Sequence, residues 1–141
     1  YNILRFFTVY SENQPTSLMF GKFASLIKEG KSVTIHGDGE MRRDYIHVSD
    51  VASACIASME SRVKNDTFNV GTGTNVSVNE VVDVLKTFAP NLTATNIDKP
   101  KGYAPHTLAD ISKTKNLLNW SPKIEIQEGL AEMFKEIFKE K

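Results

Sequence analysis

The chain opens with an almost unbroken apolar segment. Residues 3–9 are apolar or aromatic except at Arg5 and Thr8. Such runs are typical of a strand that is covered on both faces, as in a parallel sheet. The segment therefore predicts a buried strand, and it starts without the loosely held lead-in that chain termini usually have.

Two helices are predicted in the first half of the chain by apolar positions at helical spacing. The first begins at Ser17 and stops at Gly30, a residue that suits a helix C-terminus. The second covers residues 50–60, with Ser49 as its N-cap. The predicted apolar faces are Met19, Phe23, Leu26 and Ile27 in the first helix, and Val51, Cys55 and Met59 in the second.

Three further helices are predicted in the second half. Residues 77–80, Ser-Val-Asn-Glu, form a capping box, in which the serine and glutamate side chains bind N–H groups at a helix start. Pro90 ends this helix, a short helix covers residues 112–118, and a last helix follows Pro122. The predicted apolar face of the last helix is Leu130, Met133, Phe134, Ile137 and Phe138.

Short strands are predicted between the helices, at residues 32–36, 45–48, 67–70, 92–97 and 107–110. Strands that alternate with helices along a chain indicate the α/β class. The pattern contains no internal repeat and no clear interdomain linker.

A glycine turn followed by two arginines is the first candidate for chemistry. Gly37 and Gly39 suit a tight turn, and Arg42 and Arg43 carry planar donor groups that match a phosphate or a carboxylate. One interpretation is an anion site at the edge of a strand. The alternative is an ordinary hairpin with solvated arginines.

Composition narrows the classes of function. Seventeen basic residues balance seventeen acidic ones, so there is no electrostatic case for nucleic acid as a partner. No apolar run is long enough to span a bilayer, so we expect no membrane partner. Cys55 is the single cysteine and cannot form an internal disulfide, which agrees with a reducing, cytoplasmic location.

Four stretches carry a family resemblance. They are residues 4–10, residues 35–51, residues 68–73 and residues 109–123, and the second contains Arg-Asp-Tyr-Ile-His-Val from Arg43. In this order they resemble the NAD-dependent sugar-nucleotide epimerase/dehydratase family, the extended short-chain dehydrogenases of the UDP-glucose 4-epimerase type.

The resemblance implies an α/β fold that is the C-terminal, substrate-binding part of such an enzyme. Residues 1–141 would form a single partial unit. Strands at about 1–10 and 67–71 would be remnants of the parallel Rossmann sheet, and the N-terminal NAD-binding part would be absent. The implied reaction is transient oxidation of a nucleotide-linked hexose by tightly held NAD, then epimerisation or dehydration. A UDP-hexose and 4-epimerisation are the first choice, which makes an isomerase preferred to a lyase.

Two family motifs are missing from the sequence. The glycine-rich NAD fingerprint after a first strand is absent, and no tyrosine has a lysine four residues later, as the catalytic Tyr-x-x-x-Lys requires. The resemblance therefore implies that this chain alone is catalytically inactive and that it supplies substrate binding and part of the cofactor wall.

The resemblance also implies individual site residues. Arg43 would pair with the diphosphate, and Ser17 and Leu18 would present a helix N-terminus to it. Further substrate positions are Thr8, Thr34, His36 and Thr107, and Phe6 and Phe7 would lie near the nicotinamide. The simpler interpretations are a loop that enters a helix at Ser17 and core strand residues at Phe6 and Phe7.

Some positions depart from the family pattern. Ser11-Glu12 replaces the usual Gly-Pro after Tyr10. Tyr103 stands where an aspartate commonly touches the ribose, and Pro100 where a second phosphate-binding arginine is common. Lys99 or Lys101 would replace that arginine as a point charge, or would be an ordinary solvated lysine.

Other chemistry is less well supported. The turn at residues 71–73, Gly-Thr-Gly, invites a dinucleotide-binding interpretation, but Val76 occupies the position that needs a third small residue. A metal cluster would have to draw on His36, His47, His106, Asp38, Asp44 and Asp50, and their spacing matches no metal motif. We expect no metal.

Three hypotheses for the whole chain remain. The first is the nucleotide-sugar-binding portion of an epimerase, whose partners are a UDP-hexose and either the missing N-terminal part or a second copy in a homodimer. The second is a non-catalytic module that binds a nucleotide sugar or caps another subunit. The third is a plain structural fragment.

Overall fold

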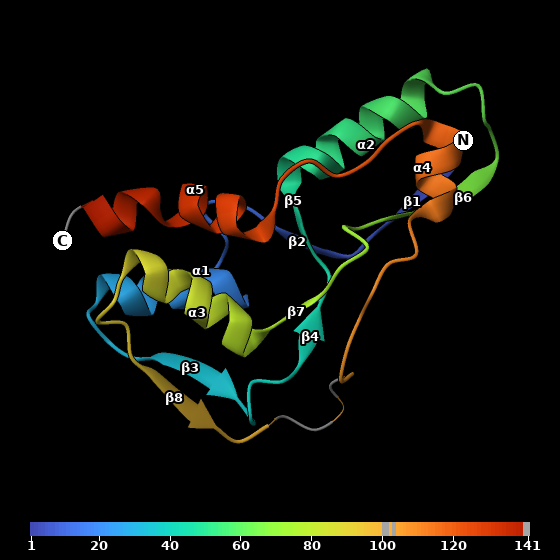
Figure 1. Cartoon of the computed structure of the whole chain (residues 1–141). Coiled ribbons are helices and arrows are strands. Elements are labelled where there is room, and N and C mark those ends of the chain that lie inside the picture. Colours follow the sequence, from blue (N-terminus) through green and yellow to red (C-terminus); the bar gives the residue numbers. More distant parts are fainter. Residues whose placement is uncertain (100–101, 103, 140–141) are drawn as a thin grey trace. The chain divides into compact units, whose positions relative to one another are not determined.

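The computed structural model describes residues 1–99, 102 and 104–139, and it has a mixed α/β architecture of short strands and helices (Figure 1). The chain divides into two compact units. Unit 1 holds residues 1–10, 43–75 and 106–126, and unit 2 holds the remainder. The chain therefore passes between the units after residues 10, 42, 75, 105 and 126.

Unit 1 contains two parallel strand pairs. β1 (Asn2–Phe6) pairs with β6 (Asp66–Val70), and β2 (Thr8–Tyr10) pairs with β5 (Tyr45–His47). The predicted first strand is therefore two strands. It divides at Phe7 because the hydrogen-bond partner changes there: Phe7 N–H donates to the Val70 carbonyl, and Thr8 N–H donates to the Asp44 carbonyl, both at 3.0 Å. The predicted parallel pairing is confirmed.

The prediction that the first strand is covered on both faces is wrong for this chain. Leu4 packs against the core, whereas Ile3 and Arg5, on the opposite face, are exposed, Ile3 with 49% of its surface. Among the described residues, β1 pairs with β6 alone. One edge and one face of this strand are therefore uncovered by the described part of the chain.

The core of unit 1 is formed by the strands with α2 (Val48–Glu60) and α4 (Ser112–Leu118). Its buried members are Ile46, Val51, Ala54, Phe68, Val70, Leu118 and Trp120. The indole Nε1–H of Trp120 donates to Ser53 Oγ at 2.8 Å, which fixes the segment after α4 against α2. α4 has the predicted bounds.

The buried face of α2 differs from the predicted face. Val51, Ala54 and Ser58 are buried, whereas Met59 is 80% exposed. The positions i, i+3 and i+7 face the strands, and Cys55 lies only partly buried beside them. The prediction followed the larger apolar side chains instead of the stripe that the strands cover.

The start of α2 was also predicted wrongly. Val48 is its first residue, and the N-cap is His47, whose Nδ1 accepts a hydrogen bond from Ser49 N–H at 3.3 Å. The imidazole of His47 lies edge-on to the Tyr10 ring, with centroids 5.3 Å apart. Pairing of β5 with β2 extends to His47, so the helix starts directly after it.

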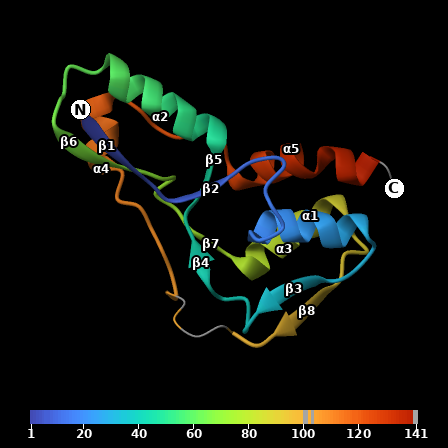
Figure 2. The same ribbon diagram turned by 180° about the vertical axis from the view of Figure 1, so that it is seen from behind.

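The described part of unit 2 contains three helices and a parallel strand pair, with the helices on one side of the strands (Figure 2). α1 (Met19–Lys28), α3 (Val78–Phe88) and α5 (Ile126–Lys139) accompany β3 (Val33–His36) and β8 (Ala94–Ile97), which pair in parallel. The predicted strands and helices of this unit are confirmed, with α1 starting two residues after Ser17. The buried apolar side chains include Phe20, Phe23, Ile27, Val33, Ile35, Val81, Val82, Leu85, Leu130, Phe134 and Ile137.

The predicted apolar face of α1 differs in detail, and that of α5 is described only in part. In α1, Phe20 is buried beside Phe23 and Ile27, while Met19 and Leu26 are only partly buried. The side chain of Phe138 in α5 lies outside the described residues.

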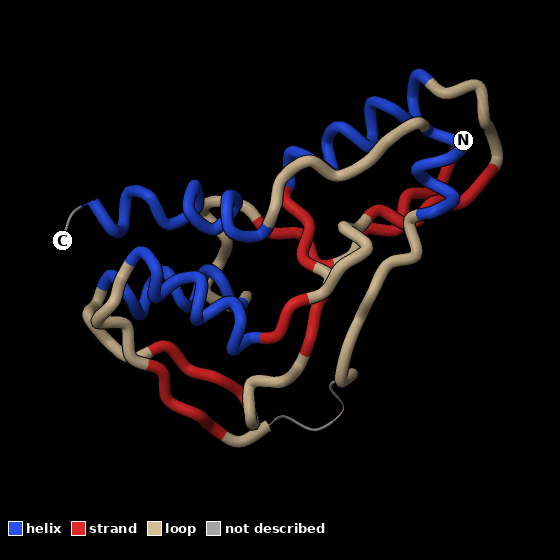
Figure 3. Tube along the Cα trace, in the orientation of Figure 1, coloured by secondary structure: helices blue, strands red, loops and turns tan. Residues whose placement is uncertain are grey.

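Two predictions about local strands also change (Figure 3). Residues 107–110 form no strand, although His106 makes an isolated bridge. The hairpin interpretation of the glycine turn is wrong, because β3 and β5 pair with other strands and β4 (Arg42–Arg43) pairs with β7 (Val76–Ser77).

Candidate functional site

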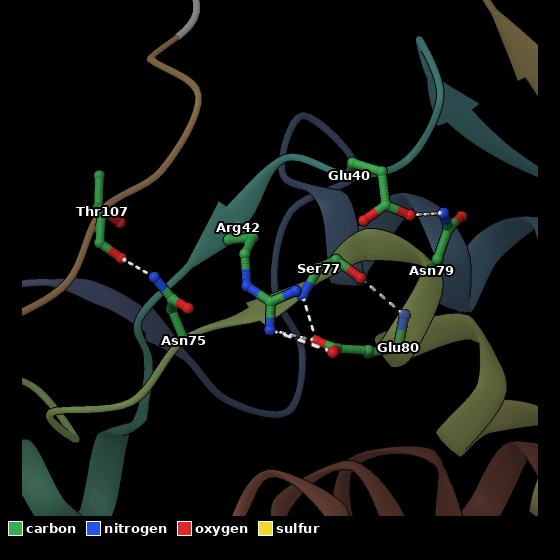
Figure 4. Close-up of polar contacts among 7 residues, drawn as sticks. All are labelled: Glu40, Arg42, Asn75, Ser77, Asn79, Glu80 and Thr107. Carbon is green, nitrogen blue, oxygen red and sulfur yellow. Dashed lines mark hydrogen bonds and ion pairs between the residues drawn. The ribbon is translucent and has the colours of Figure 1, made fainter.

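The two adjacent arginines of β4 have different surroundings. Successive side chains of a strand point to opposite faces. The guanidinium of Arg42 donates from Nη2 to both carboxylate oxygens of Glu80, at 3.1 and 2.9 Å (Figure 4). Arg42 is therefore engaged with the start of α3. Of the two arginines, we keep Arg43 as the candidate for ligand binding.

Glu80 belongs to the predicted capping box, which is confirmed. Its Oε2 accepts from Ser77 N–H at 2.7 Å, and its own N–H donates to Ser77 Oγ at 3.1 Å. The Ser77 N–H, and then Arg42, hold the pKa of Glu80 below its ordinary value of 4.5. The carboxylate is thus charged at neutral pH and ties β4 to α3.

The glycine turn is joined to the same helix start. Gly37 and Gly39 both have positive φ, +66° and +80°, which explains why glycine is needed there. Asn79 Nδ2 donates to the Asp38 carbonyl at 2.9 Å. It also donates to Glu40 Oε1 at 2.7 Å (Figure 4). The turn is held by protein side chains and carbonyls.

Arg43 lies in β4, partly buried, beside a buried phenol. Burial raises the pKa of Tyr45 to about 12, and the charge of Arg43 opposes that rise. Tyr45 therefore stays neutral at physiological pH.

Asp44, the next residue, is completely buried. Its Oδ1 accepts from Thr72 N–H at 2.7 Å and from Thr72 Oγ1–H at 2.8 Å. Its Oδ2 accepts from the N–H groups of Gly73 and Ala109, each at 3.0 Å. Sequence reasoning missed this role, and the one available signal was a carboxylate inside a strand-forming stretch.

These contacts also decide the interpretation of the Gly71–Gly73 turn. The N–H groups of Thr72 and Gly73 point at Asp44, so a protein carboxylate occupies the place that a phosphate would need. A Cβ at Gly71 would lie 2.6 Å from the Cβ of Ala109. Close packing explains this glycine, and the dinucleotide-binding interpretation is wrong.

Two predicted substrate residues meet at the Asp44 backbone. Thr8 N–H donates to the Asp44 carbonyl at 3.0 Å, and Asp44 N–H donates to Thr107 Oγ1 at 3.4 Å. Asn75 Nδ2 donates to the Thr107 carbonyl at 3.2 Å (Figure 4). Unit 1 thus places the Thr8 backbone and the Thr107 hydroxyl beside Asp44, the residue that follows Arg43.

The predicted nicotinamide neighbours lie at the division of the first strand. Phe6 ends β1 with its ring half exposed, and Phe7 is partly buried between β1 and β2. Phe6 is therefore accessible to a ligand, which a wholly buried core residue would not be.

Ser17 and Leu18 are exposed at the entry to α1. Leu18 is the N-cap residue and has no side-chain cap. Its N–H donates to the Pro15 carbonyl at 2.9 Å, so this amide is used within a turn.

Thr34 and His36 alternate with the buried residues of β3, so they share one face. The hydroxyl of Thr34 is buried and has no hydrogen-bond partner within residues 1–99, 102 and 104–139. His36 Nδ1 lies 3.3 Å from the Asp98 carbonyl, and the side chain of Lys99 lies against Gly37. Lys101, Pro100 and Tyr103 lie outside the described residues.

Three findings bear on the groups that this chain can hold. In the described ranges, no three His, Cys, Asp or Glu side chains come together as a metal site. No helix of the same ranges combines the length and apolar character needed to cross a bilayer. For NAD, the sequence has neither the glycine fingerprint nor the Tyr-x-x-x-Lys pair, so these residues alone do not fit the whole cofactor.

A family model described as "NAD dependent epimerase/dehydratase family" matches residues 1–71, half of the chain. The chain belongs to this NAD-dependent family of epimerases and dehydratases.

Among curated relatives, UDP-glucuronate 4-epimerase of Thermodesulfobacterium geofontis is 34% identical over 131 residues, which is 92% of this chain and 40% of the relative. A putative UDP-glucose 4-epimerase of Methanocaldococcus jannaschii is 35% identical over 134 residues, 92% of this chain and 43% of the relative. The chain thus spans about two fifths of these relatives.

Solved structures agree with this fold. UDP-glucose 4-epimerase of Thermotoga maritima, crystallised with UDP-glucose, superposes with a TM-score of 0.89 at 33% identity, over 99% of this chain and 46% of that one. UDP-glucuronic acid 4-epimerase of Bacillus cereus, crystallised with UDP-glucuronic acid and NAD, gives a TM-score of 0.89 at 28% identity, over 99% and 45%.

Proposed function

We propose that this chain is the nucleotide-sugar-binding portion of a UDP-hexose 4-epimerase, in which Arg43 binds the diphosphate. The single observation that carries the proposal is the position of Arg43 in the chain, next to Asp44. The Asp44 carbonyl accepts from Thr8 N–H, and the Asp44 N–H donates to Thr107 Oγ1, and these two threonines are the other predicted substrate contacts of unit 1. The similarity to UDP-sugar 4-epimerases supports UDP as the carrier.

A guanidinium suits this task. Its planar donor fork matches phosphate oxygens, and a charge-assisted hydrogen bond is stronger than a neutral one. Thr107, whose hydroxyl accepts from the Asp44 N–H, and Thr8, whose N–H donates to the Asp44 carbonyl, are the further contacts that we propose in unit 1. In unit 2, the Thr34 hydroxyl, which no described residue binds, supports a polar ligand contact on β3, with His36 on the same face and with Ser17 and Leu18 at the α1 entry as further contacts.

The chemistry of the complete enzyme is part of the proposal. NAD, when bound, accepts and returns a hydride at the sugar. This chain contributes Phe6 and Phe7 to the nicotinamide surroundings and leaves proton transfer to a tyrosine and lysine outside residues 1–141. We therefore expect the chain by itself to be inactive, and we expect an isomerase in preference to a lyase.

The domain assignment follows the same logic. β1 and β6 are a parallel pair with an edge that the described residues leave uncovered, which suits two strands of a larger Rossmann sheet. The missing N-terminal part, or a second copy in a homodimer, would cover that edge in a cytoplasmic enzyme.

The direct test is to map UDP onto the ¹⁵N-labelled chain by NMR. UDP should shift the Arg43 side-chain Nε–H signal and the amides of Asp44 and Thr107. Uridine, which has no diphosphate, should leave the Arg43 Nε–H signal in place. Shifts confined to residues remote from Arg43, or equal shifts with uridine, would contradict the proposal.

A further inference from the structure

Two separate segments of unit 1 converge on the carboxylate of Asp44, the residue between β4 and β5. They are the turn at residues 71–73 and the segment around Ala109. The backbone of Asp44 adds two more links, to Thr8 and to Thr107. One buried residue therefore connects four parts of the chain.

The donor set requires an anionic acceptor. Each carboxylate oxygen of Asp44 receives two donors, which uses the acceptor capacity of an ionised carboxyl. An asparagine of the same shape would accept at one oxygen only, and its NH₂ group would face N–H or O–H donors. The arrangement is therefore specific for aspartate at this position.

The linked segments are those that lead from unit 1 to unit 2. The chain leaves or enters unit 1 at residues 10, 43, 75 and 106, and each position lies within three residues of a group bound to Asp44. The fifth passage, after residue 126, follows Lys123 and Ile124, whose N–H groups both donate to the buried Asp50 at 3.0 Å. Asp44 and Asp50 thus anchor the part of unit 1 next to each of the five points where the chain crosses to unit 2.

We infer that Asp44 is a positioning residue for ligand binding: it fixes the backbone of Arg43 and the hydroxyl of Thr107 without touching the ligand. This inference rests on the proposed diphosphate role of Arg43. The link is short, because Arg43 is covalently next to Asp44 and Thr107 is bound to the Asp44 N–H. Losing the Asp44 carboxylate therefore releases the backbone that follows Arg43 and the segment that carries Thr107.

The test compares Asp44→Asn with Asp50→Asn in the 141-residue chain. Both variants remove a buried carboxylate that binds backbone N–H groups in unit 1, but Asp50 holds the segment of Lys123 and Ile124 instead of the segments bound to Asp44. The first measurement is hydrogen exchange. Asp44→Asn should lower protection at Thr72, Gly73 and Ala109 and leave Lys123 and Ile124 protected, and Asp50→Asn should do the reverse.

The second measurement is UDP affinity in a double-mutant cycle. Asp44→Asn should weaken UDP binding by about tenfold, while Asp50→Asn should leave it within about twofold. If Asp44 acts through Arg43 and Thr107, then the Arg43→Ala/Asp44→Asn double variant should lose less affinity than the sum of the two single losses, with only the Thr107 part remaining beyond Arg43→Ala. Thr72→Val removes one of the four donors to the Asp44 carboxylate, and it replaces Asp44→Asn in the test if that variant does not fold. It should lower hydrogen-exchange protection and UDP affinity in the same direction, by smaller amounts.

The outcomes separate this inference from the proposed function. Fully additive losses, or equal losses of affinity in the Asp44 and Asp50 variants, would overturn the positioning role and leave Arg43 as the diphosphate contact. Unchanged exchange at Thr72, Gly73 and Ala109 would overturn it as well. A folded wild-type chain without UDP affinity would contradict the proposed function, and this inference would fall with it.

Discussion

The role of a single residue in this chain depends on the groups that it contacts more than on its amino-acid type. Arg42 and Arg43 are neighbours with the same side chain, yet Glu80 engages only the first in a described ion pair. The sequence showed two equivalent donor groups. It could not distinguish them, because Glu80 reaches Arg42 only through the pairing of β4 with β7.

Buried charge was also hidden from the sequence. Asp44 and Asp50 are 0% and 2% exposed, and both are satisfied by backbone N–H groups of distant segments. A burial of this kind depends on contacts across 65 and 73 residues of sequence. Local patterns identify a strand or a helix start but not such a partner.

Gly39 offers a prediction at this scale. A Cβ there would lie 2.1 Å from Asn79 Oδ1, and φ is +80°. A non-glycine residue in the left-handed conformation costs roughly 1–2 kcal/mol. Gly39→Ala should lower the free energy of unfolding by more than this, because the added Cβ also forces Asn79 to give up its hydrogen bonds to the turn. Urea unfolding measures the loss.

Gly30→Ala is the matched control. Its φ is +69°, and a Cβ added there would meet no described atom within 4 Å. It should show the backbone cost alone. Equal losses in the two variants would contradict the role assigned to Asn79.

At the scale of elements, prediction succeeded where the signal was local. The Ser77–Glu80 capping box and the bounds of α4 were identified from the sequence because caps and helical spacing lie within a few residues. The start and buried face of α2 were not, since β5 and the neighbouring strands determine both. Residues 107–110, predicted as a strand, run beside Asp44 and Asn75 through side-chain hydrogen bonds instead.

The capping box gives a prediction about pH. The pKa of Glu80 is held below 4.5, chiefly by Ser77 N–H, so its stabilisation is complete above 4.5 and is lost as the pH falls through the lowered folded value. Glu80→Gln should lower the free energy of unfolding at pH 7 and reduce its fall between about pH 5 and 3. Denaturant unfolding at a series of pH values measures both effects.

Ser77→Ala is the companion variant. It should cost about 1 kcal/mol through the lost N-cap while keeping the Glu80 carboxylate. If the free energy of unfolding falls equally steeply with acid in wild type and in Glu80→Gln, the role assigned to the Glu80 charge would be contradicted.

At the scale of the whole molecule, the main feature is that β1 leaves apolar side chains exposed and one strand edge unpaired within the described residues. Ile3 and Phe6 present apolar surface beside a strand edge that the described residues leave unpaired. Such edges promote association with another chain. We therefore predict that the isolated chain self-associates through β1, with an apparent mass by light scattering that increases with concentration.

Substituting this surface should reverse the effect. Ile3→Lys should favour the monomer, while Met59→Lys, at an exposed apolar position on α2, should leave association unchanged. A monomeric wild type with residues 3–9 protected from hydrogen exchange would show that the edge needs no partner.

The parallel character of the sheet and the family were both predicted from the sequence, because the motifs of residues 4–10 and 35–51 are ordered and local. Which strands pair with one another was not predicted. The individual ligand contacts are a different matter. They remain predictions, since they depend on how Arg43 and its neighbours meet a nucleotide.

The central claim is that Arg43 carries the affinity for UDP. Titration calorimetry of UDP into the wild-type chain, Arg43→Ala and Arg42→Ala tests it most directly. A lost charge-assisted contact of about 1.5–3 kcal/mol corresponds to a 10- to 150-fold weaker affinity, roughly, for Arg43→Ala, and Arg42→Ala should stay close to wild type. Equal affinities in all three chains, or a larger loss in Arg42→Ala, would contradict the account.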